Sequence, residues 1–139
     1  MHEVYLSLGT NLGHREENLQ EAIRRINGKV GAVVAQSAFM DTEPWGYQSS
    51  RHYLNACVRV ATEMSPRAIL RATQLIERQM GRRHKTQNGV YRDRIIDIDI
   101  LLYDDVSIDE PDLKIPHPRM LERDFVMQPL REIMPDGQL

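Results

Sequence analysis

An α+β fold in one domain over residues 1–139 is predicted by three features of the sequence. Several segments alternate apolar and polar residues, as strands do, and two segments repeat apolar residues every three or four positions, as helices do. Two strand-like segments separate the two helical ones, an order typical of α+β proteins. The length suffices for one hydrophobic core, and no repeat, linker or low-complexity segment divides the chain.

The first half of the chain contains three predicted strands and one predicted helix. Val4, Leu6 and Leu8 share one face of the first strand, and apolar residues at helical spacing follow a glycine-containing turn. In chain order the elements are a strand at 4–8, a turn at 9–13, a helix around 19–26 that ends at Gly28, a strand at 30–39, a loop at 41–50 and a strand at 53–62.

The second half begins with a helix whose two ends are well marked. Ser65 offers a capping hydroxyl, Pro66 suits the first helical position, and Gly81 marks the end. Its predicted apolar stripe consists of Ile69, Ala72, Leu75, Ile76 and Met80. A basic connection at 82–94 leads to a strand at 95–103, after which the chain is irregular and Pro-rich, with a short helix around 120–134.

This order of elements predicts a ferredoxin-like βαββαβ fold, in which a four-stranded antiparallel sheet carries two helices on one face. The even-numbered apolar residues of the third and fourth strands should face the helices. Tyr53, Asn55, Asp97 and Asp99 should then lie on the opposite, open face. The loops at 41–50 and 82–94 are long enough to border a site there, and the C-terminal segment is irregular.

Two carboxylates are expected on one face of the last strand. Asp97 and Asp99 alternate with large apolar residues at 96, 98, 100 and 102, so both point the same way. Their Cα atoms lie about 7 Å apart, where two charges repel by roughly 2 kcal/mol at an effective dielectric constant of 20. Solvated acids on an exposed face are the alternative, but mid-strand aspartates are unfavourable, and a hard cation such as Mg²⁺ would explain them.

A concentrated positive stretch precedes these aspartates. Residues 82–94 hold five arginines and lysines and one histidine against a single acid, Asp93, on a chain whose net charge is −2. The stretch is either a solvated loop or a site for a specific anion such as a polyphosphate. No glycine-rich P-loop is present, so phosphate contacts would come from side chains and metal.

Composition excludes several other classes of protein. The net charge argues against general nucleic-acid binding, and no apolar run is long enough to span a membrane. The first residues are polar rather than typical of a signal peptide, and Cys57 cannot form a disulfide within the chain. We therefore expect a cytoplasmic protein that binds neither nucleic acid nor membrane.

Aromatic and amide side chains form a third group of candidates, namely Trp45, Tyr53, Asn55 and Phe125. Each could simply fill the core or the surface, but together they suit a flat heteroaromatic ligand. His117 lies between two prolines, where a structural role and a nucleotide contact both stay open. Gln74 and Glu77 are placed on the side of their helix away from the apolar stripe, where a solvated face is the simpler interpretation.

Five motifs in order resemble the 6-hydroxymethyl-7,8-dihydropterin pyrophosphokinase family of folate biosynthesis, over nearly the whole chain. They are Leu8-Gly9-Thr10-Asn11-Leu12, Tyr53-Leu54-Asn55-Ala56, Gln74-Leu75-Ile76-Glu77 with Gly81-Arg82, Arg94-Ile95-Ile96-Asp97-Ile98-Asp99-Ile100-Leu101, and Ile115-Pro116-His117-Pro118 with Arg123-Asp124-Phe125. The resemblance implies an ATP-dependent diphosphokinase that transfers diphosphate from MgATP to the pterin hydroxymethyl group and releases AMP.

The resemblance also implies roles for individual residues. Asp97 and Asp99 are the implied ligands of two Mg²⁺ ions, and the implied catalytic set is completed by Arg82 and Arg94. The implied ATP contacts are Gln74, Glu77, Arg82, His84, Arg94, Ile100, His117 and Arg123. The implied pterin contacts are Asn11, Thr42, Trp45, Tyr53, Asn55, Asp97 and Phe125. ATP and the pterin are the expected partners of a monomer.

The sequence departs from the family pattern at three places. His84 holds a position that is often more basic, Glu43 stands where an uncharged residue is usual, and the connection before Asp97 is about two residues longer and lacks a tryptophan that Tyr91 could replace. Two rival functions use the same features. A metal-dependent phosphohydrolase would use water as the nucleophile, and an RNA-binding sheet module would need a basic surface that this chain lacks.

Overall fold

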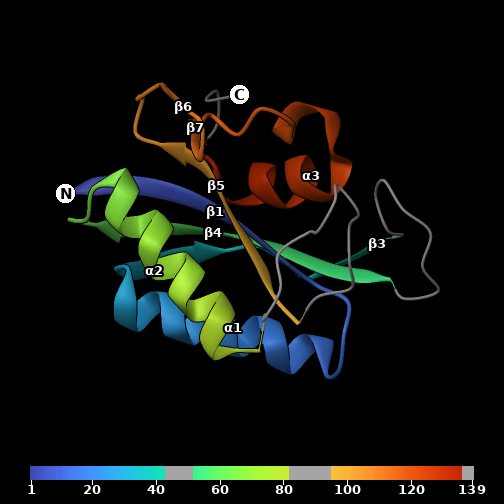
Figure 1. Ribbon diagram of the computed structural model, residues 1–139. Coiled ribbons are helices and arrows are strands. Elements are labelled where there is room, and N and C mark those ends of the chain that lie inside the picture. The colour runs from blue at the N-terminus through green and yellow to red at the C-terminus, as the bar shows by residue number, and fades with distance from the viewer. Residues whose placement is uncertain (43–51, 82–94, 136–139) are drawn as a thin grey trace.

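The computed structural model describes residues 1–42, 52–81 and 95–135 (Figure 1). Strands and helices follow the predicted order, with two short strands added after the main sheet. The strands are β1 His2–Thr10, β2 Ala32–Gln36, β3 Met40–Thr42, β4 Tyr53–Thr62, β5 Asp97–Tyr103, β6 Ile108–Glu110 and β7 Leu113–Ile115. The helices are α1 Arg15–Lys29, α2 Pro66–Gln79, the 3-10 turn η1 Met120–Glu122 and α3 Asp124–Ile133.

The main sheet has the order β2-β4-β1-β5, with every neighbouring pair antiparallel, which confirms the predicted α+β ferredoxin-like fold. The segment predicted as one strand at 30–39 is instead two strands, β2 and β3, which both pair with β4. Ser37 separates them because its hydroxyl oxygen accepts the backbone N–H of Cys57 at 2.9 Å, in place of a strand carbonyl. Asp41 and Thr42, predicted in a loop, belong to β3.

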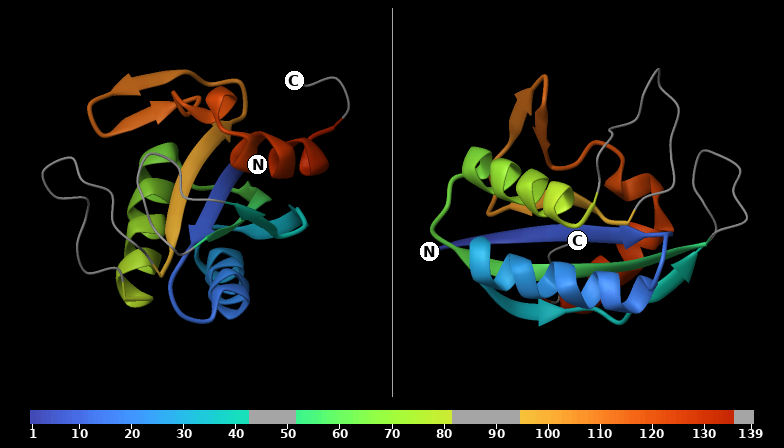
Figure 2. Two further views of the ribbon diagram at one scale, coloured as in Figure 1. Left: turned by 90° about the vertical axis from the view of Figure 1, so that its right-hand side faces the viewer. Right: turned by 60° about the horizontal axis from the view of Figure 1, so that its bottom comes forward.

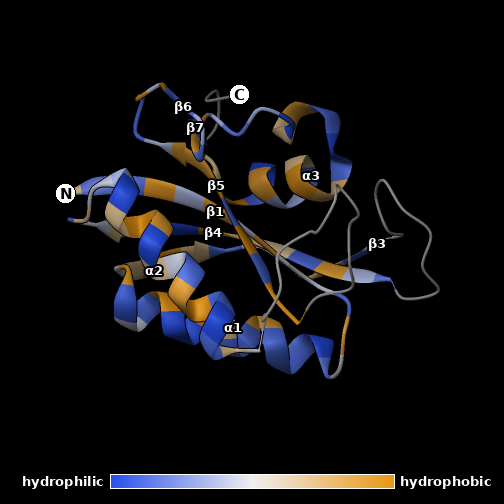
Figure 3. Ribbon diagram, viewed as in Figure 1, coloured by the Kyte–Doolittle hydropathy of each residue, from blue (hydrophilic) through white to orange (hydrophobic). Residues whose placement is uncertain are grey.

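Helices α1 and α2 pack on one face of the sheet, where the main hydrophobic core lies (Figures 1 and 2). The even-numbered apolar residues of β4, and those of β5 that precede its bulge, enter this core as predicted, among them Leu54, Val58, Ile98 and Ile100. Hydrophilic residues predominate on the outside of α1 (Figure 3). The amphipathic pattern of α1 therefore indicated correctly which side of that helix meets the sheet.

Gly28 does not end α1, contrary to the prediction, because the helix continues through Lys29 and closes with a hydrogen bond from the Val30 N–H to the Ile26 carbonyl. The glycine that the fold requires is Gly31. A Cβ atom at that position would lie 2.1 Å from the Ala61 carbonyl oxygen on β4. Close approach of two backbones, rather than a helix stop, accounts for a glycine in this region.

Helix α2 begins as the sequence predicts but presents a different stripe to the core. The Ser65 hydroxyl accepts the Ala68 N–H at 3.2 Å, and Gly81 has a positive φ of +106°. The buried positions are Ile69, Thr73, Ile76 and Glu77, whereas Leu75 is 37% exposed. The stripe is thus rotated from the predicted one, and the interpretation of Glu77 as a solvated residue is wrong.

Helix α3 covers part of the sheet face that the sequence analysis expected to be open (Figure 2). A second, smaller core forms there between odd-numbered strand residues and the helix; its buried members are Tyr5, Cys57, Leu101, Met120, Val126, Met127, Leu130 and Ile133. The helix was predicted around 120–134, but its docking was not. Beyond this core on the same face, Gly9 and Asn55 are also buried and Asp97 is half-buried.

A β-bulge interrupts the predicted alternation of side chains in β5. Pairing with β1 shifts between Tyr5 and Leu6, so that Leu6 faces Ile100 and Tyr5 faces Leu102. One extra residue on β5 turns Leu101 and Leu102 toward the second core, whereas Leu102 was predicted on the helix side. The two aspartates precede the bulge and keep the predicted alternation.

Beyond β5 the chain forms a hairpin, β6–β7, that was not predicted. The Arg67 guanidinium ties it to α2 by donating to Glu110 and, through both Nη atoms, to Asp112 at 2.8 Å.

The Ile115–Pro116 peptide bond, directly after β7, is cis. In the part of the chain that the structure describes, no helix has the length and apolar character needed to cross a membrane.

Candidate active site

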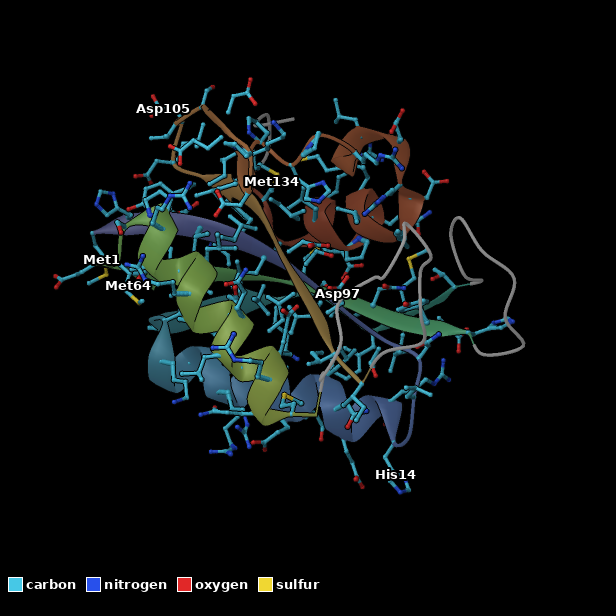
Figure 4. All side chains as sticks on the ribbon, in the orientation of Figure 1. Met1, His14, Met64, Asp97, Asp105 and Met134 are labelled. Atoms are coloured by element: carbon cyan, nitrogen blue, oxygen red, sulfur yellow. The ribbon has the colours of Figure 1, made fainter. Side chains whose placement is uncertain are left out.

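One row of residues across three strands forms the centre of the candidate site. In the strand register, Gly9 on β1 lies between Asp97 on β5 and Asn55 on β4. Residues directly opposite one another share a face of the sheet, so the side chains of Asp97 and Asn55 flank a position that has no side chain. Asp97 is labelled on β5 in Figure 4. The structure thus brings together a predicted metal ligand and a predicted pterin contact.

The next row on the same face contains the second aspartate. Asp99 lies opposite Ser7, and Ser7 lies opposite Cys57. Burial raises the pKa of the Cys57 thiol to about 12, so this cysteine is a neutral core residue rather than a nucleophile. Asp97 and Asp99 are both partly exposed, whereas Ile96, Ile98 and Ile100 between and beside them are buried. The predicted two-faced strand is confirmed over these residues.

The donor chemistry of the two aspartates fits Mg²⁺. Mg²⁺ in nucleotide sites is commonly held by one or two carboxylates, and the substrate phosphates and water supply the remaining oxygens. Among residues 1–42, 52–81 and 95–135 there is no cluster of three or more His, Cys, Asp or Glu side chains that could enclose a metal alone.

The Asn55 side chain has a defined orientation. Its Nδ2 donates to the Thr42 hydroxyl at 2.7 Å and to the Met40 carbonyl at 3.4 Å. A carbonyl oxygen only accepts hydrogen bonds, so the amide nitrogen must face β3 and the amide oxygen must face β1. Asn55 is only 6% exposed and lies opposite Met40 in the β3–β4 register, where Thr42 and Tyr53 form the next pair on the same face. The strand pairing thus brings three of the predicted pterin contacts together.

Glu77 reaches the metal strand from α2. Its Oε2 accepts the backbone N–H of Ile98, the residue between the two aspartates, at 2.8 Å. Glu77 as a whole is only 7% exposed. Gln74, one turn earlier on α2, is half-buried. The structure therefore gives Glu77 a contact with the strand that carries Asp97 and Asp99, which the sequence analysis did not anticipate.

A pocket of about 260 Å³ lies beside Asp99, between α2, β5 and the β6–β7 hairpin. Ile100 and His117, both predicted ATP contacts, line it. Leu70 of α2 and the hairpin residues Pro111, Asp112, Leu113 and Lys114 complete most of the wall. Leu70 and Lys114 were missed in the sequence analysis, because neither carries a motif and the hairpin itself was not predicted.

His117 is fixed by two backbone contacts. Its N–H donates to the Leu101 carbonyl at 2.9 Å, and its Nδ1 accepts the Arg119 N–H at 3.2 Å. The neutral ring therefore carries its proton on Nε2. Burial, and then the positive charge of Arg123, lower the pKa of His117, and the negative charge of Asp97 opposes this. Above its lowered pKa, His117 is thus neutral and can donate a hydrogen bond from Nε2.

The remaining predicted residues are dispersed around this centre. Arg123 lies just before α3, and its guanidinium carbon is 5.5 Å from the centroid of the Phe125 ring, which packs against the second core. Asn11 is 2% exposed in the turn after β1. Seven residues named from the sequence, Glu43, Trp45, Arg82, His84, Tyr91, Asp93 and Arg94, lie outside the described residues.

Comparisons with known proteins identify the family of the chain. The family model for 7,8-dihydro-6-hydroxymethylpterin-pyrophosphokinase (HPPK) matches residues 5–135. The chain is 47% identical over 133 residues to a 2-amino-4-hydroxy-6-hydroxymethyldihydropteridine pyrophosphokinase of Porphyromonas gingivalis, covering 95% of this chain and 90% of that protein. The corresponding enzyme of Bacillus subtilis is 38% identical over 131 residues, covering 94% of this chain and 77% of that protein.

Solved structures show the same fold at lower sequence identity. A crystal structure of HPPK-DHPS in complex with substrates superimposes with a TM-score of 0.71 at 17% identity, covering 96% of this chain and 40% of that chain. Plasmodium falciparum HPPK-DHPS with pteroate gives a TM-score of 0.59 at 17% identity, covering 77% of this chain and 30% of that one. The chain thus spans less than half of these longer proteins. On the family match and the two enzyme relatives, it belongs to the 7,8-dihydro-6-hydroxymethylpterin-pyrophosphokinase family.

Proposed function

We propose that the protein transfers diphosphate from MgATP to the hydroxymethyl group of 6-hydroxymethyl-7,8-dihydropterin. The hydroxymethyl oxygen attacks the β-phosphorus of ATP, the bond from that phosphorus to the α-phosphate oxygen breaks, and AMP leaves. The row Asp97–Gly9–Asn55 is the observation that carries this proposal. It sets a carboxylate suited to the phosphate-bound metal beside an amide suited to the pterin, so the attacking oxygen and the β-phosphorus would meet above one strand.

The proposed nucleotide site is the pocket beside Asp99. His117 presents its Nε2–H as a neutral donor toward ligand oxygens, and Ile100 offers its backbone at the pocket edge. Gln74, Glu77 and Arg123 are the other proposed ATP contacts among the described residues. Arg82, His84 and Arg94, from the basic stretch before β5, are proposed to pair with the phosphates, since arginine suits phosphate oxygens.

The proposed pterin site is centred on Asn55. Its amide oxygen faces β1 and can accept hydrogen bonds from the N–H groups at a pterin edge, because its nitrogen is already engaged with Thr42 and Met40. Tyr53 and Phe125 would contact the ring faces. Asn11, Asp97 and Trp45 complete the proposed set.

We propose two Mg²⁺ ions, held by Asp97 and Asp99. When bound, they would neutralise charge on the triphosphate and orient the attacking oxygen. Catalysis is proposed to come mainly from positioning and charge neutralisation, for which a dedicated general base is not needed. A monomeric state and a cytoplasmic location stay predictions.

The experiment that tests the function follows the products of ATP turnover with and without the pterin. The proposal predicts AMP and a pterin diphosphate in equal amounts, formed only when both substrates and Mg²⁺ are present. A phosphohydrolase using the same carboxylates would instead release phosphate or diphosphate from ATP without any pterin. Pterin-independent hydrolysis at a rate equal to that with pterin would overturn the proposed transfer.

A further inference from the structure

Gly9 occupies the middle of the row between Asp97 and Asn55. A Cβ atom built on Gly9 would lie 3.0 Å from the Asn55 Oδ1 and 3.4 Å from the Cδ1 of the Tyr53 ring. The first of these separations is closer than carbon and oxygen ordinarily approach without hydrogen bonding, whereas the second is ordinary contact. Asn55 and Tyr53 are thus drawn against the β1 backbone into space that any other residue would fill.

The Asn55 amide cannot easily withdraw from such a Cβ. Its nitrogen is held by the Thr42 hydroxyl at 2.7 Å and by the Met40 carbonyl at 3.4 Å, and the residue is nearly fully buried. Turning the amide over would place its oxygen against the Met40 carbonyl, where two acceptors would face each other. A methyl group at position 9 would therefore move the amide oxygen or break its contacts with β3.

We infer that Gly9 is a specificity-determining position for the pterin, acting through Asn55 and Tyr53 as a positioning residue. The absence of a side chain fixes how far the Asn55 acceptor and the Tyr53 ring sit from β1. That distance selects a flat heterocycle whose N–H groups point at the acceptor while one ring face meets the tyrosine. The inference rests on the proposed function, because it takes Asn55 as a pterin contact.

The test compares Gly9→Ala with Gly28→Ala, which makes the same substitution at a glycine with nothing within 4 Å of its added Cβ. Steady-state kinetics is measured for both substrates, and folding is checked by circular dichroism. We expect Gly9→Ala to raise the KM for the pterin about tenfold or more, a common effect of one misplaced methyl group in a pocket. The KM for ATP should stay within about twofold of the wild-type value. Gly28→Ala should change neither KM.

A double substitution separates positioning from general damage. If Gly9 acts through Asn55, adding Gly9→Ala to Asn55→Ala should weaken pterin binding little further, because the oxygen that the methyl group would displace is gone. The double variant also answers the case in which Gly9→Ala alone does not fold. A Gly9→Ala variant that matches Gly28→Ala, one that raises both KM values equally, or a double variant with fully additive losses would each overturn the inference. An inactive wild-type protein would instead overturn the proposed function.

Discussion

The carboxylate of Glu77 on α2 accepts a hydrogen bond of 2.8 Å from the backbone N–H of Ile98, the residue between Asp97 and Asp99. Because β5 lies at one end of the strand order, its outward N–H groups have no neighbouring strand in the described sheet. Glu77 supplies the missing acceptor at the point where the two aspartates are attached. The helix thereby fixes the backbone that aims both carboxylates.

Replacing Glu77 should weaken both stability and the response to metal. Glu77→Ala leaves a buried N–H without its acceptor, so we expect the free energy of unfolding to fall by about 1–3 kcal/mol. The Mg²⁺ concentration for half-maximal activity should rise. Glu77→Gln keeps an acceptor oxygen, so its free energy of unfolding and its response to Mg²⁺ should change less than those of Glu77→Ala. Urea unfolding and Mg²⁺ titrations measure the two effects, with exposed Glu63→Ala as the control. A wild-type Mg²⁺ response in Glu77→Ala would show that Glu77 does not position the aspartates.

The two aspartates should be needed for activity but not for folding. We expect Asp97→Asn or Asp99→Asn to lower the rate of AMP formation by about 100- to 1,000-fold or more, the range typical of removing a key charge from an active site. Stability should be kept or increased, because each variant removes a like-charge repulsion of roughly 2 kcal/mol across about 7 Å. Thermal unfolding and product analysis check both outcomes.

Asp105→Asn is the matched control for these variants, since Asp105 is exposed in the turn after β5 (Figure 4). It should leave activity and stability unchanged. Equal activity of Asp97→Asn and Asp105→Asn would contradict the metal assignment.

The sequence was most informative where one periodicity held over a whole element. Alternation through 53–62 predicted β4 to the residue, and alternation at 96–100 correctly set Asp97 and Asp99 opposite the core. It failed at Leu102, because a bulge depends on pairing with β1 and leaves no mark on the strand's own pattern.

Tertiary contacts account for the other misses. Glu77 next to an apolar stripe is typical of a solvated helix edge, and only the packing of α2 against β5 shows that its carboxylate is buried. Strands of three residues, such as β6 and β7, contain too few alternating positions to be recognised. The pocket beside Asp99 depends on that hairpin, so its wall could not be predicted from the sequence.

Arg67 does not line the proposed nucleotide pocket, but it should affect ATP binding by holding the hairpin that forms part of the pocket wall. Its guanidinium holds Glu110 and Asp112, and the hairpin that carries them supplies several residues of the pocket wall. The Arg67 side chain is 40% exposed, so the ion pairs themselves add little stability. We expect Arg67→Gln to raise the KM for ATP about three- to tenfold through a less ordered hairpin, with the KM for the pterin unchanged.

The control for Arg67 is Arg71→Gln, one turn further along the same helix and exposed. It removes an equal charge and should leave both KM values at the wild-type level. A similar rise in the KM for ATP in both variants would attribute the effect to net charge rather than to the hairpin.

His117 should titrate at lower pH than an ordinary histidine in the protein without ligand. Burial and Arg123 lower its pKa, so between the ordinary value near 6.5 and the folded value the unfolded chain binds more protons than the folded one. The contribution of His117 to the free energy of unfolding is therefore fully present above about pH 6.5. It is lost as the pH falls through the pKa that His117 has in the folded protein. Nitrogen-detected NMR should find the proton on Nε2, because the Arg119 N–H occupies Nδ1. His117→Gln should flatten this part of the stability profile, and a ring already charged at pH 6.5 would contradict the assignment.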